Sequence, residues 1–256
     1  MAGKPQLRNA LKKLRAVEAR IGEEFDRVET GQEMLDLLAV VDGLKPVFLH
    51  GRGLVDPAWM AGVVDVARGL GLRIVQGPCW NPLPPGEAFP GWYVECVETE
   101  LAPYRPFYIC KASVVAREVE EICAAGGRPT IEREAALLGY PECCVVEHHA
   151  QMSAYYRYVI ARIEELAAGD EGRMRALYGT EIDLAPRSPE EEYLLDIAFD
   201  IVPCPFGSWN ACRACQDEDD SPSLALSEAY QALAWDVDLA LHDLLTPPEE
   251  EAEEEG

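Results

Sequence analysis

The segment LLGYPECCVVEHH, residues 137–149, joins two predicted helices through a short break. Gly139 is expected to end a helix over residues 131–138, because glycine readily adopts the left-handed conformation that often follows a helix. Pro141 is typical of a first helical position, so a new helix is predicted over about residues 141–166. This arrangement makes the segment the junction on which the helical half of the chain depends.

The junction places Cys143 and Cys144 in the first turn of the new helix. Free N–H groups and a partial positive charge at a helix N-terminus lower the pKa of a thiol and favour the thiolate, which binds metals and attacks electrophiles. Cys144 and His148 are four residues apart and share a helix face. Cys143, Cys144 and His148 are therefore also candidate catalytic residues. His149 continues an apolar stripe and is predicted to lie in the core.

A second cysteine motif lies about sixty residues downstream, in a loop rich in turn-forming residues. Cys212 and Cys215 form a C-x-x-C pair, a spacing that recurs in zinc and iron–sulfur sites. Cys204 precedes them by eight positions and stands between two prolines, which restrict where its sulfur points. Packing is the better interpretation of the remaining four cysteines, namely Cys79, Cys96, Cys110 and Cys123.

Three loop cysteines need a fourth ligand to close a metal site, and the pair at the junction supplies it. The candidate metal ligands are Cys143, Cys144, Cys204, Cys212, Cys215 and His148. Zinc would take Cys144, the C-x-x-C cysteines and either Cys204 or His148. An iron–sulfur cluster would take one thiolate of the pair and three from the loop. Five thiols exceed what zinc uses, which favours the cluster. At least three of the five sulfurs should lie within about 4 Å of one another for zinc or roughly 7 Å for a cluster.

The stretch LLGYPECCV, residues 137–145, followed by a Pro-Cys segment, resembles the family of unknown function numbered 483. The resemblance covers roughly residues 105–215. It implies that Gly139, Tyr140, Pro141, Cys143 and Cys144 act as a unit. The spacing after Cys204 is longer here than the short Cys-to-Cys spacing of that family.

Composition narrows the range of partners. With 22 basic and 46 acidic residues, the net charge of −24 repels phosphate backbones. The one basic cluster, KKLRAVEAR at residues 12–20, is interleaved with acids, so nucleic acid is not the expected partner. The sequence contains no apolar stretch long enough for a membrane span and no signal-peptide pattern, so a cytoplasmic location is expected. Nine cysteines in that reducing compartment are not expected to form a disulfide framework.

The predicted fold class is α+β or α/β, with a small mixed sheet and flanking helices in the N-terminal half. A helical C-terminal half carries the cysteine-rich loop. Four sections are expected: N-terminal helices over 1–42, an α/β section over 43–128, a helical section over 129–246 and a disordered acidic tail over 247–256. The alternating or apolar patterns predict strands at residues 46–50, 72–76, 92–98 and 106–112.

Helix starts carry recognisable signals. Thr30 with Glu33 has the spacing of a capping box, while Asp56 and Ser188 each precede a proline suited to a first helical position. A last helix is expected over about residues 222–245.

These patterns favour a cytoplasmic metal-binding protein that holds an iron–sulfur cluster or zinc, with redox activity as one option. Two alternatives remain open. One is a thiol-dependent enzyme in which Cys143 or Cys144 is the nucleophile and His148 the base. The other is an interaction module in which zinc is purely structural. The sequence names neither a small-molecule nor a protein partner.

Overall fold

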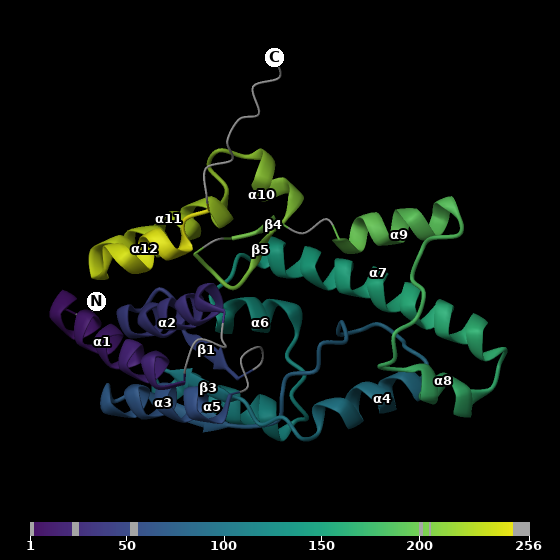
Figure 1. Ribbon diagram of the computed structural model, residues 1–256, viewed down its shortest axis with the longest axis horizontal. Helices are drawn as coiled ribbons and strands as arrows, with labels where there is room; N and C mark the ends of the chain where they lie inside the picture. The colour runs from purple at the N-terminus through teal and green to yellow at the C-terminus, as the bar shows by residue number, and fades with distance from the viewer. Residues whose placement is uncertain (1–2, 22–25, 52–55, 200–201, 205, 248–256) are drawn as a thin grey trace, which may run out of the picture.

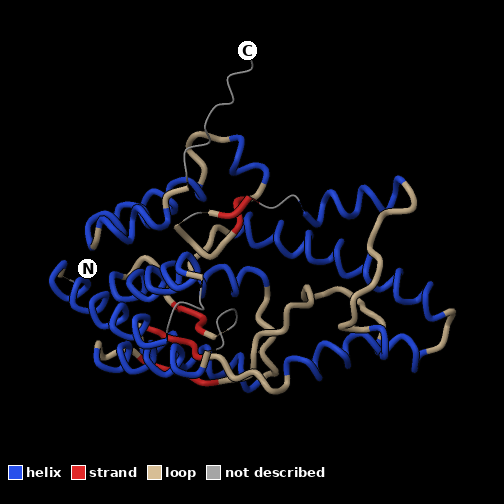
Figure 2. The backbone as a smooth tube through the Cα atoms, in the orientation of Figure 1, coloured by secondary structure: helices blue, strands red, loops and turns tan. Residues whose placement is uncertain are grey.

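The computed structural model describes residues 3–21, 26–51, 56–199, 202–204 and 206–247. Helices dominate among these residues, and a small three-stranded sheet lies among the helices of the N-terminal half (Figures 1 and 2). The predicted α+β class is confirmed. None of the helices within the described ranges is long and apolar enough to cross a membrane. The predicted acidic tail falls, from residue 248 onward, outside the described residues.

The first two helices, α1 (Lys4–Ile21) and α2 (Arg27–Asp42), pack against each other. Their presence was predicted, but the start of α2 was not. Asp26 caps the helix, and its carboxylate accepts a hydrogen bond of 2.7 Å from a first-turn N–H. Thr30 is therefore not a cap; it is buried inside α2 and its hydroxyl donates to Glu18 at 2.7 Å. Asp26 precedes Thr30 by one helical turn and accepts a hydrogen bond from a free N–H at the helix start, so the helix begins before Thr30.

The sheet contains β1 (Val47–His50), β2 (Arg73–Gln76) and β3 (Phe107–Cys110), with β3 in the centre. Both neighbouring pairs are antiparallel, so the sheet is antiparallel rather than mixed. Helix α3 (Pro57–Gly69) covers one face and α5 (Ser113–Ala124) the other. Such a sheet, buried on both faces, explains the apolar character of its central strand.

Alternate residues along the strands separate two layers of core. Phe48 and Ile109 lie in one core cluster with Trp59 of α3. Tyr108 and Cys110 lie in another with Val119 of α5. The two-residue period of a strand thus divides the N-terminal half into two apolar layers.

The predicted strand over residues 92–98 is wrong, because these residues lie in helix α4 (Gly91–Leu101). A short apolar run does not distinguish a strand from a buried helix. Tyr93 and Val97 are buried at a spacing of four residues, and the terminal Leu101 of the helix extends that spacing. The alternation that suggested a strand arises from a helix with one broad apolar face.

The two proline-associated helix starts are confirmed. Asp56 accepts a 2.7 Å hydrogen bond from the backbone N–H of Trp59 at the start of α3. Ser188 accepts one of 3.2 Å from the N–H of Glu191 at the start of α9 (Pro189–Phe199).

The helical half is organised around α7 (Glu142–Ala167). Helix α6 (Ile131–Leu138) packs near its start, α8 (Glu171–Leu177) follows its end, and α9 lies alongside it. Helix α8 was not predicted. Its N-cap, Asp170, accepts a 3.0 Å hydrogen bond from the N–H of Arg173.

The last predicted helix is two helices, α11 (Pro222–Val237) and α12 (Leu239–Leu245). Asp238 separates them with an extended backbone, and its carboxylate accepts a 3.0 Å hydrogen bond from the N–H of Leu241. Both helices return to the other end of the chain and pack on α1 and α2 (Figure 1). The two termini of the described chain therefore share one apolar core.

Gly139 makes the turn between α6 and α7, and replacing it with alanine is expected to lower the free energy of unfolding by about 2 kcal/mol. Its φ is +72°, and a Cβ atom would meet Pro46 Cδ at 3.0 Å. Gly179 is the matched control: its φ is +71°, but a Cβ would meet nothing within 4 Å. Urea unfolding should show a smaller loss, about 1 kcal/mol, for Gly179→Ala. Equal losses would show that the contact with Pro46 costs nothing.

Candidate metal centre

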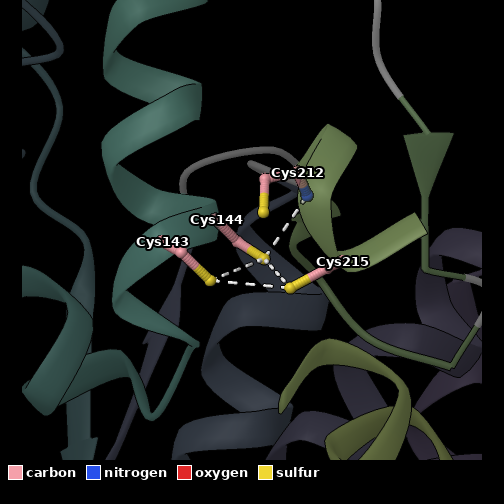
Figure 3. A group of neighbouring side chains, drawn as sticks. All are labelled: Cys143, Cys144, Cys212 and Cys215. Atoms are coloured by element: carbon pink, nitrogen blue, oxygen red, sulfur yellow. Dashed lines mark hydrogen bonds between the residues drawn. The ribbon is translucent and has the colours of Figure 1, made fainter. Parts of the chain in front are cut away.

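Four cysteines from two distant segments meet at the start of α7 (Figure 3). The sulfurs of Cys143, Cys144, Cys212 and Cys215 all lie within 4.8 Å of one another. The sulfur of Cys215 lies 3.5 Å from that of Cys143 and 3.7 Å from that of Cys144, and the sulfurs of Cys143 and Cys144 are 4.0 Å apart. The expectation that at least three of the five sulfurs would lie within about 4 Å is met.

The junction predicted from the sequence places the first pair. Gly139 ends α6 in the left-handed conformation, and α7 begins immediately after Pro141. Pro141 is the N-cap rather than the first helical residue, and its carbonyl accepts the N–H of Cys144 at 3.0 Å. Each cysteine is therefore one position nearer the helix start than predicted, and both sulfurs still face the incoming loop (Figure 3).

A small hairpin presents the second pair. Strands β4 (Val202–Pro203) and β5 (Asn210–Ala211) pair antiparallel, and α10 (Arg213–Asp217) follows at once. Cys212 is the N-cap of α10, and Cys215 lies within that helix. The spacing of three residues brings both sulfurs to the same side. The backbone N–H of Cys212 also donates to the sulfur of Cys144, across 3.4 Å.

The two remaining candidate ligands lie outside this group of four. Cys204 is buried at the base of the hairpin, where its N–H donates to the carbonyl of Trp209 at 3.1 Å. Its sulfur lies 3.6 Å from the hydroxyl of Ser223 on α11. His148 instead lines a small cavity of about 100 Å³, together with Cys144. His149 is buried, as predicted from the apolar stripe, with Nε2 at 2.9 Å from a carboxylate oxygen of α6.

The pKa values of Cys143 and Cys144 are raised, whereas a position in the first turn of a helix was expected to lower them. Burial, followed by the neighbouring thiols, raises the pKa of Cys143 to about 11. Burial also raises the pKa of Cys144, more than the N–H of Cys212 lowers it. Burial opposes ionisation of Cys215 as well, but hydrogen bonds from the Ser223 backbone and from the other thiols lower its pKa. A metal that binds here must displace protons from the first two thiols.

A buried polar network adjoins the cysteine group, and the sequence did not reveal it. Lys45 lies 2.8 Å from Asp36, and the two side chains are only 2% and 6% exposed. Lys45 also donates to the hydroxyl of Tyr140 at 2.8 Å, which lies 3.0 Å from the hydroxyl of Ser208. Ser208 and Tyr230 both donate to the Asp36 carboxylate. Burial lowers the pKa of Lys45, but Asp36 and Tyr140 together outweigh it through their charges and hydrogen bonds, so the pKa is raised.

This network forms one wall of a polar cavity of about 370 Å³, to which Lys45 and Asp36 contribute. Tyr140 and Ser208 line both this cavity and the small one beside Cys144, so they separate the cysteine group from the larger space. One signal was present in the sequence. Asp36 interrupts the apolar run MLDLLAVV, residues 34–41, and a buried charge needs a partner.

Comparison of the chain with family models, with curated proteins and with solved structures found no match. The resemblance to the family of unknown function numbered 483 stays a prediction. The function is therefore argued from the geometry of the side chains.

Proposed function

We propose that the protein binds one zinc ion through Cys143, Cys144, Cys212 and Cys215. The spacing of the sulfurs supports this proposal. Four thiolates at about 2.3 Å from a tetrahedral zinc lie about 3.8 Å from one another. The three separations of 3.5, 3.7 and 4.0 Å scatter around that value.

The same spacing argues against the iron–sulfur cluster that the number of thiols favoured. A cluster of several iron atoms holds its cysteine sulfurs roughly 7 Å apart, whereas all four sulfurs here lie within 4.8 Å. The fifth thiol, Cys204, faces Ser223 and stands outside the group. The surplus of thiols is therefore no longer an argument against zinc.

We infer that the zinc is structural. Four cysteine ligands close the coordination sphere and leave no position for a substrate or an activated water. The ion would join the first turn of α7 to the hairpin of β4 and β5. That hairpin carries Ser208, so the ion would also hold Ser208 against Tyr140 and Asp36.

The thiol-enzyme alternative has one supporting observation, because Cys144 and His148 line the same small cavity. It requires a thiolate that is free to react. Burial raises the pKa of both candidate nucleophiles, Cys143 and Cys144, so their thiolates are scarce at neutral pH unless a metal binds them.

Metal analysis of protein purified without chelators tests the proposal. We expect one zinc per chain, a colourless solution and release of the zinc when the thiols are modified by a mercurial reagent. A brown protein with iron and absorbance near 400 nm would replace zinc with a cluster. A metal-free protein in which Cys143 or Cys144 is alkylated rapidly at pH 7 would favour the thiol enzyme.

A further inference from the structure

A large cavity lies toward the opposite end of α7 from the cysteines. It has a volume of about 550 Å³ and lies between α4, α7, α8 and the loop that follows α8. Four tyrosines line it, with several aliphatic side chains between them: Tyr93, Tyr155, Tyr156 and Tyr178. The size and the mostly apolar wall are typical of a small-molecule site.

The charges in the wall have one sign. Glu100 and Glu181 line the cavity, and the described lining residues include no lysine, arginine or histidine. Glu100 is held in place by the hydroxyl of Tyr178, which donates to it at 2.5 Å. The faces of aromatic rings are also electronegative. Both features attract a cation and repel an anion.

The rings are inclined to one another rather than stacked. Tyr93 and Tyr178 have centroids 5.5 Å apart and planes at 77°, while Tyr93 and Tyr156 lie 5.9 Å apart at 55°. These are edge-to-face and tilted contacts between neighbouring rings, and all three tyrosines line the cavity. Such an arrangement resembles the aromatic cages that bind methylated ammonium groups through cation–π attraction.

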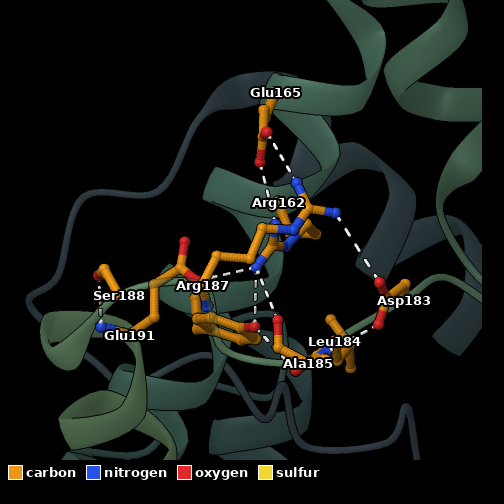
Figure 4. Close-up of polar contacts among 9 residues, drawn as sticks. Arg162, Glu165, Asp183, Leu184, Ala185, Arg187, Ser188 and Glu191 are labelled. Atoms are coloured by element: carbon orange, nitrogen blue, oxygen red, sulfur yellow. Dashed lines mark hydrogen bonds and ion pairs between the residues drawn. The ribbon is translucent and has the colours of Figure 1, made fainter.

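A buried arginine helps to hold the loop after α8, and this loop contributes Leu184 to the cavity wall (Figure 4). Arg162 is 1% exposed; it donates to the carbonyl of Ala185 at 3.1 Å and pairs with Glu191 at 2.8 Å. Tyr158, beside it on α7, donates to the carbonyl of Leu184 at 2.8 Å. These bonds hold the loop after α8 against α7, so the cavity is formed before a ligand arrives. A preformed site binds with less loss of conformational entropy.

We propose that this cavity binds a small organic cation that carries a methylated ammonium group. The aromatic rings would contact the methyl groups, and Glu100 would supply the counter-charge. The ligand is a free small molecule, because its binding space lies between packed helices and one tightly held loop. The site is separate from the cysteine group and does not depend on the zinc proposal.

Calorimetry with choline, compared with its uncharged isostere 3,3-dimethylbutan-1-ol, tests the proposal at constant ionic strength. The two probes have the same shape, so the difference reports the charge. We expect choline to bind at least about ten-fold more tightly than the alcohol. Equal affinities, or no heat of binding from choline, would overturn the proposal.

Substitutions locate the site. Glu100→Gln, which keeps the shape of a side chain in the wall, is expected to weaken choline binding about three- to ten-fold. Tyr178→Leu removes a ring and should weaken it at least about ten-fold, whereas Tyr178→Phe should retain most of it. Tyr193→Leu is the control, since Tyr193 lies on α9, is 64% exposed and is not among the lining residues. Binding that is unchanged in Glu100→Gln and Tyr178→Leu would show that choline binds elsewhere.

A separate experiment distinguishes a free small molecule from the choline head group of a lipid. Free choline should bind while phosphatidylcholine vesicles fail to sediment the protein. Sedimentation with the vesicles, lost in Glu100→Gln, would overturn the assignment to a free small molecule and indicate a lipid head group.

Discussion

Cys212→Ser is expected to abolish zinc binding and to lower the midpoint of thermal unfolding by about 10 °C. Structural zinc contributes its binding free energy to folding, with apparent values of about 10–16 kcal/mol in small zinc domains. This chain has a larger apolar core than a small zinc domain, so most of its stability does not depend on the metal. We expect the free energy of unfolding to fall by about 3–5 kcal/mol, which corresponds to about 10 °C for a chain of this size. Zinc content and thermal unfolding are measured on the same preparation.

Cys204→Ser is the matched control, because it changes a buried thiol of the same loop that lies outside the group of four. The serine hydroxyl remains near the hydroxyl of Ser223, which lies 3.6 Å from the present sulfur. This variant should keep one zinc per chain. Loss of zinc from Cys204→Ser together with its retention in Cys212→Ser would reverse the assignment of ligands.

The sequence predicts only in part which cysteines join the group, and Cys204 shows why. The first-turn pair and the C-x-x-C spacing predicted that cysteines of the two segments would meet, but each expected ligand set took only one cysteine of the pair, whereas both Cys143 and Cys144 lie in the group of four. The direction of the Cys204 side chain depends on a hairpin closed by its hydrogen bond to Trp209. That hairpin is stabilised by packing on α11, which no local pattern encodes.

The fold likewise has features that the local sequence predicts and features that depend on contacts between distant segments. The caps at Asp56 and Ser188 were predicted, since a side chain that bonds its own helix start leaves a local signature. Helix α4 was missed, because seven apolar and acidic residues fit a strand and a helix equally well. The contacts of α11 and α12 with α1 and α2 join residues more than 180 positions apart, and they follow from shape complementarity across the whole core.

The buried network connects the cysteine group to that core. Tyr140 lies within the junction before α7, Ser208 lies within the hairpin, and Asp36 belongs to α2. Zinc would hold the first two segments together, and the carboxylate of Asp36 receives hydrogen bonds from both Ser208 and Tyr230. The cysteine group and the N-terminal helices are therefore connected through one buried hydrogen-bonded network.

Lys45→Met should destabilise the protein by about 3–5 kcal/mol, because it leaves the Asp36 carboxylate buried without its cation. Asp36 keeps hydrogen bonds from Ser208 and Tyr230, but hydroxyl groups do not neutralise a charge. Combining Lys45→Met with Asp36→Leu should recover about half of the loss, since the charge disappears while the hydroxyl groups lose their acceptor. Urea unfolding with a constant m-value provides the free energies.

Lys4→Met is the control for this loss, because Lys4 and Asp236 also lie 2.8 Å apart but their side chains are 61% and 51% exposed. Water screens such a pair, so the change should cost less than about 1 kcal/mol. The contrast isolates burial, since the distance between the charges is the same in both pairs. If Lys45→Met costs no more than Lys4→Met, the buried pair does not stabilise the fold, and the link between the cysteine group and α2 must rest on the hydroxyl hydrogen bonds to Asp36 and on apolar packing.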